Sequence, residues 1–352
     1  MPRLALVLLA LVPAATRAAD PTAAITSPKP EGVVGLKEAV TGTFAGGWPV
    51  VAVRVPTGEV YVQPPIAPGR NGTFTGEAYF GDKDNTGRGT RYELLVFTAP
   101  TQKDAATIKP GLQKEMPKLP VAAKQFVYRD ERIAFGGQTW AVKKFARMDP
   151  GPNRWTDDTA AVFLDKKKHL NLGVMPANKG WACTEVVCND ALGFGTYTWT
   201  FRTDLAAFDH QAVLGLFTYQ NSANKQGIPD KEIDFELSRW GDAKNELGQF
   251  VVQPYLGPGK KNIDRYPVPP DAKQPLTAKY VWAKGVVEAV CTDAGGKELR
   301  KWNYKTGTEP GVAVPPADGK ERAIANLWLY EGKAPQAGKP VRVVVESFAF
   351  KK

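Results

Sequence analysis

The sequence has few residues that bind soft metal ions and no long apolar segment. Two histidines and three cysteines occur in 352 residues, without the HExxH or paired CxxC spacing of a zinc site. No apolar run reaches the roughly 20 residues of a membrane-spanning helix. No 3.6-residue apolar period lasts a dozen residues. These absences argue against zinc or iron enzymes, membrane-spanning proteins and long helices.

Glycine, proline and tryptophan are abundant instead. The chain contains 34 Gly, 29 Pro and 9 Trp, and 43% of its residues are hydrophobic. Frequent turns together with ordinary hydrophobicity indicate a globular β-rich protein, long enough for one large domain and a small partner.

The charge balance is basic, with a formal net charge of +10. Apart from Lys166–Lys168 the basic residues are scattered, which argues against a nucleic-acid footprint. The balance favours an anionic glycan or cell envelope as the partner.

Residues 1–18 are typical of a secretory signal peptide. Arg3 precedes an apolar run from Leu4 to Val12, and small residues follow up to a plausible cleavage point after Ala18. A short buried helix is the alternative. The pattern predicts a secreted or periplasmic protein, and removal of Arg3 and Arg17 would lower the net charge to +8.

The cysteines do not predict a disulfide framework, because their number is odd. Cys183 and Cys188 either pair in an oxidising compartment or are two buried small hydrophobic residues, and Cys291 is left over.

Two domains are predicted. Short β-rich runs in 22–100, with the hairpin signal Asn71-Gly72, indicate a small immunoglobulin-like sandwich. The Lys-rich segment 101–129 is interpreted as a linker that packs partly on a neighbour. From 130 to 352, eight strand-like runs predict one large two-sheet antiparallel sandwich.

The segment KEIDFELSRW, residues 231–240, carries the most chemical information. On a strand, Glu232, Asp234 and Glu236 share one face, while Ile233 and Phe235 point into the core. A retaining glycosidase needs one carboxylate as nucleophile and a second carboxyl as proton donor, and a third between them helps to separate their pKa values. The alternative is an acidic, solvated strand face.

EIDFE followed by aromatic residues resembles the motif of glycoside hydrolase family 16. LGFGTYTW, AVLGLFTYQ, GQFVVQPY, ANLWLYEG and VRVVVESFAF are similar to strands of that family across 133–350. The resemblance implies an all-β, concanavalin A-like jelly-roll of the glucanase type in the second domain.

By the same resemblance, Glu232 is the nucleophile, Asp234 the assisting acid and Glu236 the general acid/base. The substrate-binding residues it implies are Trp240, Trp328, Asn326, Tyr219 and Glu185. For each Trp the alternative is core packing. The sequence departs from the lichenase pattern at Asp230, at Val187 and at VCTDAGG, which leaves the substrate more open than the reaction.

These features predict an endo-acting glycosidase of a polysaccharide, most consistent with β-1,3- or β-1,3-1,4-glucan, with agar- or carrageenan-type galactan as a further option. The alternative is a non-catalytic lectin or envelope protein on the same fold. No cofactor, nucleic acid or integral membrane association is expected, and the chain is expected to be monomeric. Family members often hold a structural calcium ion, but its ligands are not identified here. Whether the N-terminal domain binds glycan is left open.

Overall fold

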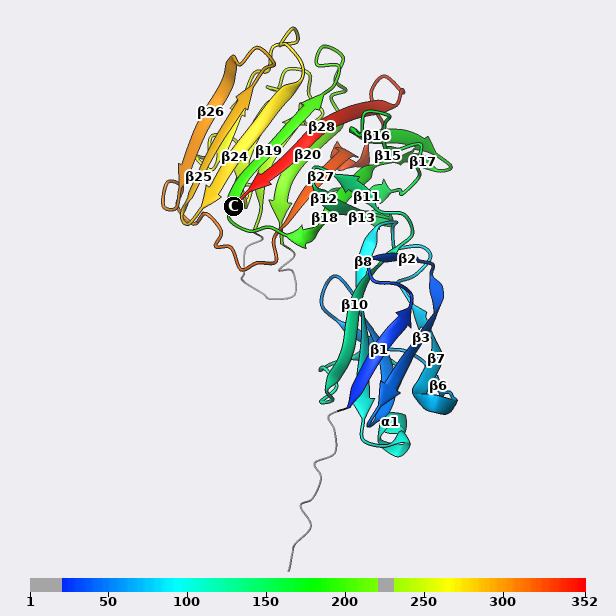
Figure 1. The fold of residues 1–352 in the computed structure, drawn as a ribbon. Coiled ribbons are helices and arrows are strands. Elements are labelled where there is room, and N and C mark those ends of the chain that lie inside the picture. Colours follow the sequence, from blue (N-terminus) through cyan, green and yellow to red (C-terminus); the bar gives the residue numbers. More distant parts are fainter. Residues whose placement is uncertain (1–20, 221–230) are drawn as a thin grey trace, which may run out of the picture.

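The computed structural model describes residues 21–220 and 231–352. The predicted signal peptide and Asp230 lie outside these residues. The described chain is almost entirely β and forms two sandwiches joined end to end (Figure 1). In the described part of the chain, no helix is both long and apolar enough to cross a membrane.

The N-terminal sandwich consists of a four-stranded and a six-stranded sheet. In spatial order, the first contains β1 (Thr22–Ser27), β3 (Lys37–Ala45), β7 (Thr73–Tyr79) and β6 (Ala67–Pro68), and the second contains β2 (Gly32–Val34), β10 (Val121–Arg129), β8 (Thr90–Ala99), β4 (Trp48–Arg54), β5 (Val60–Val62) and β9 (Gly111–Gln113). The turn η1 (Arg70–Gly72) and helix α1 (Gln102–Thr107) complete it. The predicted hairpin is confirmed: β6 pairs with β7, and Asn71 and Gly72 both have positive φ.

The interpretation of 101–129 as a linker is wrong. β10 pairs along its whole length with β8, and Val127 belongs to the core between the two sheets. Lysines and prolines mask the strand period in this segment, and a strand that pairs with a distant partner leaves little local signal. The N-terminal unit therefore extends to about residue 129.

The second domain confirms the predicted two-sheet antiparallel jelly-roll sandwich. One sheet, in order, contains β11 (Ile133–Phe135), β12 (Gln138–Val142), β18 (Thr184–Ala191), β27 (Arg322–Leu329), β20 (Ala212–Tyr219), β21 (Ile233–Ser238), β22 (Gly248–Val252) and β23 (Ile263–Tyr266). The other contains β15 (Val162–Leu164), β16 (Leu170–Ala177), β28 (Val341–Lys351), β19 (Gly195–Arg202), β24 (Leu276–Ala283), β25 (Val286–Thr292) and β26 (Glu298–Lys305), with β17 (Gly180–Ala182) on β16. The ribbon β13 (Phe145–Met148) and β14 (Asn153–Trp155) and the turn η2 (Tyr330–Gly332) lie outside them.

Aromatic side chains fill the space between the two large sheets. Phe235 on β21 contacts Phe201 on β19, with ring centroids 5.5 Å apart, and Trp140 on β12 contacts Trp199 at 5.8 Å. The predicted inward set of β21, Ile233, Phe235 and Leu237, is buried in this core. The opposite face of β21 is thereby turned outward, toward a cleft.

The cysteines are all free and buried. Cys183 and Cys188 lie five residues apart along an extended segment, so their side chains point to opposite faces and their Cα atoms are about 16 Å apart, far beyond disulfide reach. The Cys183 thiol contacts Asn153, and the Cys188 thiol contacts Gln138. Cys183 and Cys188 are therefore buried small hydrophobic residues and do not form a disulfide.

The two sandwiches are in direct contact through the start of β8 and the end of β12. Val142 N–H donates to the carbonyl of Arg88 at 2.8 Å, and Arg91 forms an ion pair with Asp190 at 2.7 Å. At Gly87 an added Cβ would lie 1.7 Å from the carbonyl oxygen of Val142, so no side chain fits there.

Gly87→Ala is therefore expected to lower the free energy of unfolding by about 1–3 kcal/mol, as overpacking typically does. Urea denaturation measures the change. Gly35→Ala is the matched control, because its Cβ would make only ordinary contacts, 3.6 Å or more from its neighbours. Equal stability of the two variants would contradict the tight fit at Gly87.

Candidate active site

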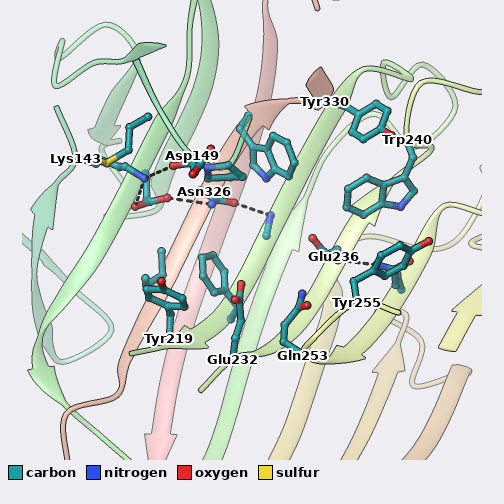
Figure 2. Close-up of a pocket in the computed structure, with 18 of the residues that line it drawn as sticks. Lys143, Asp149, Tyr219, Glu232, Glu236, Trp240, Gln253, Tyr255, Asn326 and Tyr330 are labelled. Atoms are coloured by element: carbon teal, nitrogen blue, oxygen red, sulfur yellow. Dashed lines mark hydrogen bonds and ion pairs between the residues drawn. The ribbon is translucent and has the colours of Figure 1, made fainter. Parts of the chain in front are cut away.

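Glu232, directly before β21, and Glu236, on β21, line a cleft on the outward face of the first large sheet (Figure 2). Because side chains alternate on a strand, Glu232, Asp234 and Glu236 share this face, as predicted. They are less exposed than the sequence suggested: Asp234 is only 3% exposed, and Glu232 and Glu236 are half-buried. Side chains from neighbouring strands, such as Gln249 and Gln253, flank them, so the alternative of a solvated acidic strand face is not what the structure contains.

Strand register places a row of polar groups across the floor of the cleft. Glu236 is opposite Gly215 on one side and Gln249 on the other. The complete row, from β18 to β23, is Glu185, Asn326, Gly215, Glu236, Gln249 and Arg265. Gly215 is required in this row, because an added Cβ would lie 2.5 Å from Oδ1 of Asn326. The glycine leaves open space beside Glu236.

Glu236 is held in a state suited to proton donation. Burial raises its pKa from 4.5 to about 7, while the hydrogen bond from Gln249 Nε2 to Oε2, at 2.7 Å, and the positive charge of Arg265 act in the opposite direction. A carboxyl that titrates near neutral pH can give up and recover a proton during a reaction.

The surroundings of Asp234 favour its protonated form. Burial raises its pKa well above the ordinary value of 3.8, and the nearby charges of Glu232 and Glu236 raise it further. The Asp234 carboxyl is hydrogen-bonded to Glu232 and accepts a hydrogen bond from Gln253 Nε2 at 2.8 Å. Burial therefore raises the pKa of both Asp234 and Glu236, and a carboxyl with a raised pKa can act as a proton donor near neutral pH.

The β18 end of the row is neutralised. Glu185 is 6% exposed, forms an ion pair with Lys143 at 3.1 Å and accepts a hydrogen bond from Asn326 at 3.1 Å. Asn326 in turn accepts the Gly215 N–H at 3.1 Å, and Lys143 lies 4.2 Å from the centroid of Trp155. Glu185 and Asn326 line the cleft, as predicted, but their first contacts are with each other and with Lys143.

An aromatic wall closes the opposite side. Trp240, in the turn after β21 with φ of 52°, meets Trp328 edge-on at 6.1 Å and Tyr330 at 5.7 Å. Trp240 is partly exposed, whereas Trp328 is only 8% exposed and packs behind it. Trp328 lines the cleft on the same face of β27 as Asn326, but its ring is largely covered and supports Trp240. Tyr219, at the end of β20, is half-buried and lines the cleft.

The cleft, about 850 Å³, also contains residues that the sequence did not single out. They are Lys143, Met148, Asp149, Pro150, Phe217, Gln249, Gln253, Tyr255, Arg265, Ile324 and Tyr330. Gln249 and Gln253 lie in the run GQFVVQPY. Their even spacing places them on the same face of an extended segment, and this alternation could have predicted that both face the cleft. Arg265 lies on β23, beyond β22 from β21, and local sequence carries no sign of its position.

The described residues, 21–220 and 231–352, contain no cluster of three or more His, Cys, Asp or Glu side chains that could hold a metal ion. The structural calcium ion that the family resemblance allows stays untested.

No protein-family model matches the chain, and no curated protein matches it. Among solved structures, it is similar to a β-glucanase of Bacillus licheniformis, at 16% identity and a TM-score of 0.44, over 60% of this chain and 92% of that one. It is also similar to a β-1,3-1,4-glucanase (lichenase) from a mouse hindgut metagenome, at 19% identity and 0.44, over 63% and 97%. A third is an immunostimulatory antigen and pseudo β-1,3-glucanase of Mycobacterium tuberculosis, at 16% identity and 0.42, over 59% and 88%. Likeness at this level does not establish a family or an activity for the chain.

Proposed function

We propose that the chain is a secreted, retaining endo-β-glycosidase that cleaves internal bonds of a polysaccharide. The observation that carries the proposal is the placement of three carboxyl groups on one strand face: Glu232 and Glu236 line the cleft, and Asp234 is buried between them and hydrogen-bonded to Gln253. Burial also raises the pKa of Glu236 to about 7. The aromatic wall at Trp240 supports a sugar ligand, since flat aromatic faces stack on the C–H faces of pyranose rings. β-1,3- or β-1,3-1,4-glucan is the first substrate class to test, followed by agar- and carrageenan-type galactans.

In the first half-reaction, Glu232 attacks the anomeric carbon while the glycosidic C–O bond breaks. Glu236 gives its proton to the leaving oxygen, and a covalent glycosyl-enzyme forms. In the second, Glu236 takes a proton from water, the water oxygen attacks the same carbon, and the bond to Glu232 breaks. Asp234, through its hydrogen bond to Glu232, orients the nucleophile and limits repulsion along the strand.

The direct test is release of reducing ends from laminarin, mixed-linkage β-glucan, agar and carrageenan, with the anomeric configuration of the first product followed by NMR. Retention is expected. Glycan binding without any product would instead support a lectin, and inversion would contradict the assignment of Glu232 as nucleophile. The chain is expected to act as a monomer, which sedimentation checks.

The alkaline limb of the pH profile tests the role of Glu236. The limb of kcat/KM is expected near pH 7, where the proton donor ionises. In Arg265→Gln the positive charge that favours the Glu236 carboxylate is lost, so its pKa rises and the limb moves to higher pH by about half a unit or more. Lys279→Gln, which removes the same charge from an exposed position on β24, is the control and leaves the limb in place. A limb that stays unmoved in Arg265→Gln would contradict the role of Glu236 as acid.

A further inference from the structure

A second cleft, of about 610 Å³, lies on the N-terminal sandwich. The outer ribbon of β5 and β9 belongs to the six-stranded sheet and extends that sheet beyond β4. The cleft lies beside this ribbon and is lined by Tyr61 on β5, by Tyr79 at the end of β7, and by the loop from Gly81 to Thr86. None of these residues takes part in the chemistry proposed for β21.

The tyrosines of this cleft are unusually exposed. Tyr61 is 37% and Tyr79 is 43% exposed. Of the four exposed aromatic residues in the described part of the chain, these two line the second cleft, Tyr255 lines the first, and Phe126 lies in neither. A cation lies over two of these rings: Arg91 is 4.8 Å from the centroid of Phe126, and Lys37 Nζ is 5.7 Å from that of Tyr79. Exposed aromatic residues are thus concentrated in the two clefts.

A buried glutamine holds the strand positions of both tyrosines. Gln63, 6% exposed, donates from Nε2 to the carbonyl of Tyr61 and accepts the Tyr79 N–H at Oε1, each at 2.8 Å. The two rings are therefore carried on a fixed scaffold that bridges the two sheets. A preformed site loses little conformational entropy when a ligand binds.

Polar side chains stand beside the rings. Asp82 and Asn85 are exposed and line the cleft, and Asp82 accepts the N–H groups of Asp84 and Asn85 at 2.8 and 2.7 Å, which fixes the loop. Aromatic faces combined with carboxylate and amide groups suit a ligand that has both C–H faces and hydroxyls, which is the chemistry of a sugar chain.

The loop of the second cleft continues into the contact between the domains. Gly87, directly after Thr86, packs against the carbonyl of Val142. Lys143, which follows Val142 in the sequence, lines the cleft that contains Glu232 and Glu236. One rigid backbone contact therefore connects the walls of the two clefts.

We propose that the Tyr61–Tyr79 cleft is a second glycan-binding site, which takes the same polysaccharide as the cleft on the second domain. The identity of its ligand rests on the proposed function. The site contributes affinity for long chains and nothing to bond cleavage, because two linked sites on one polymer bind more tightly than either alone.

The test uses the full chain with Glu232→Gln as a binding-only background and laminarin, mixed-linkage β-glucan, agar and carrageenan as probes in affinity electrophoresis. Tyr61→Ala and Tyr79→Ala are each expected to weaken binding of the preferred polysaccharide about two- to tenfold, the range of one aromatic contact. Tyr61→Phe retains the ring and the affinity. Val121→Ala, an exposed apolar position on β10, leaves binding unchanged.

In the active chain, the same two alanine variants are expected to raise KM on the polysaccharide and to leave kcat/KM on short oligosaccharides unchanged. Hydrolysis with unaltered polysaccharide binding in both variants overturns the second site but leaves the proposed activity intact. If the chain binds glycan through Tyr61 and Tyr79 but hydrolyses nothing, the proposed activity is contradicted and the second binding site is supported. Loss of self-association in sedimentation, without loss of glycan binding, identifies the cleft as a contact between copies and also overturns the proposal.

Discussion

Glu232→Gln is expected to lower kcat on the preferred polysaccharide by at least about 10³-fold, which is roughly 4 kcal/mol of transition-state stabilisation. The amide retains the shape of the side chain but cannot form the glycosyl-enzyme, so the first half-reaction has no nucleophile. Substrate affinity is expected to change little, because the aromatic wall at Trp240 remains. Release of reducing ends measures the loss, and affinity electrophoresis measures the retained binding.

A small nucleophile restores the reaction in a diagnostic way. In Glu232→Gly, azide can enter the space left by the side chain and attack the anomeric carbon of an activated aryl glycoside directly. The product is a glycosyl azide of inverted configuration, which NMR identifies. Glu288→Gln, at an exposed position on β25, is the control and keeps full activity. Near-normal turnover by Glu232→Gln would disprove the assignment of this residue.

Glu236→Gln is the second large effect, and it separates activity from stability. Loss of the proton donor is expected to lower kcat on polysaccharide by about 10²–10⁴-fold, the usual contribution of general acid catalysis. The loss is expected to be smaller on aryl glycosides with acidic leaving groups, which depart without protonation. Comparison of kcat on the two kinds of substrate measures this difference.

Stability is expected to change in the opposite direction. The pKa of Glu236 is about 7 in the folded chain and near its ordinary value of 4.5 in the unfolded chain. Below pH 4.5 the carboxyl is protonated in both states; as the pH rises toward 7, the unfolded state releases its proton first and the folded state loses relative stability.

Glutamine at this position removes that loss. Glu236→Gln is therefore expected to be more stable than the unmodified chain at pH 8. The difference in the free energy of unfolding is expected to decrease as the pH falls and to become constant below pH 4.5. Urea denaturation at pH 4 and pH 8 measures it. A difference that is independent of pH would show that burial does not raise the pKa of Glu236.

The local sequence predicted the elements that depend on alternation. KEIDFELSRW has apolar and acidic residues at every second position, and the structure buries Phe235 while Glu232 and Glu236 face the cleft. The hairpin at Asn71-Gly72 was predictable for a similar reason, since few residues tolerate positive φ. Both are properties of a few neighbouring residues.

The errors arose where partners are distant. β10 was interpreted as a linker because its strand character depends on β8. For Trp328 the sequence left substrate binding and core packing open, because whether a Trp on a strand is core or cleft wall depends on what packs against it, here Trp240. Burial of Asp234 likewise results from neighbouring strands such as β22.

By itself, the sequence determined which side chains share a face, because a strand reverses its side chains at every residue. Only the tertiary structure decided which faces meet. Asn326 contacts Gly215 across 111 residues of sequence, Gln249 reaches Glu236 from the next strand, and Arg265 joins the row from β23. The raised pKa values of Asp234 and Glu236 follow from these long-range pairings, since burial and neighbouring charge set a pKa and neither is a property of the residue alone.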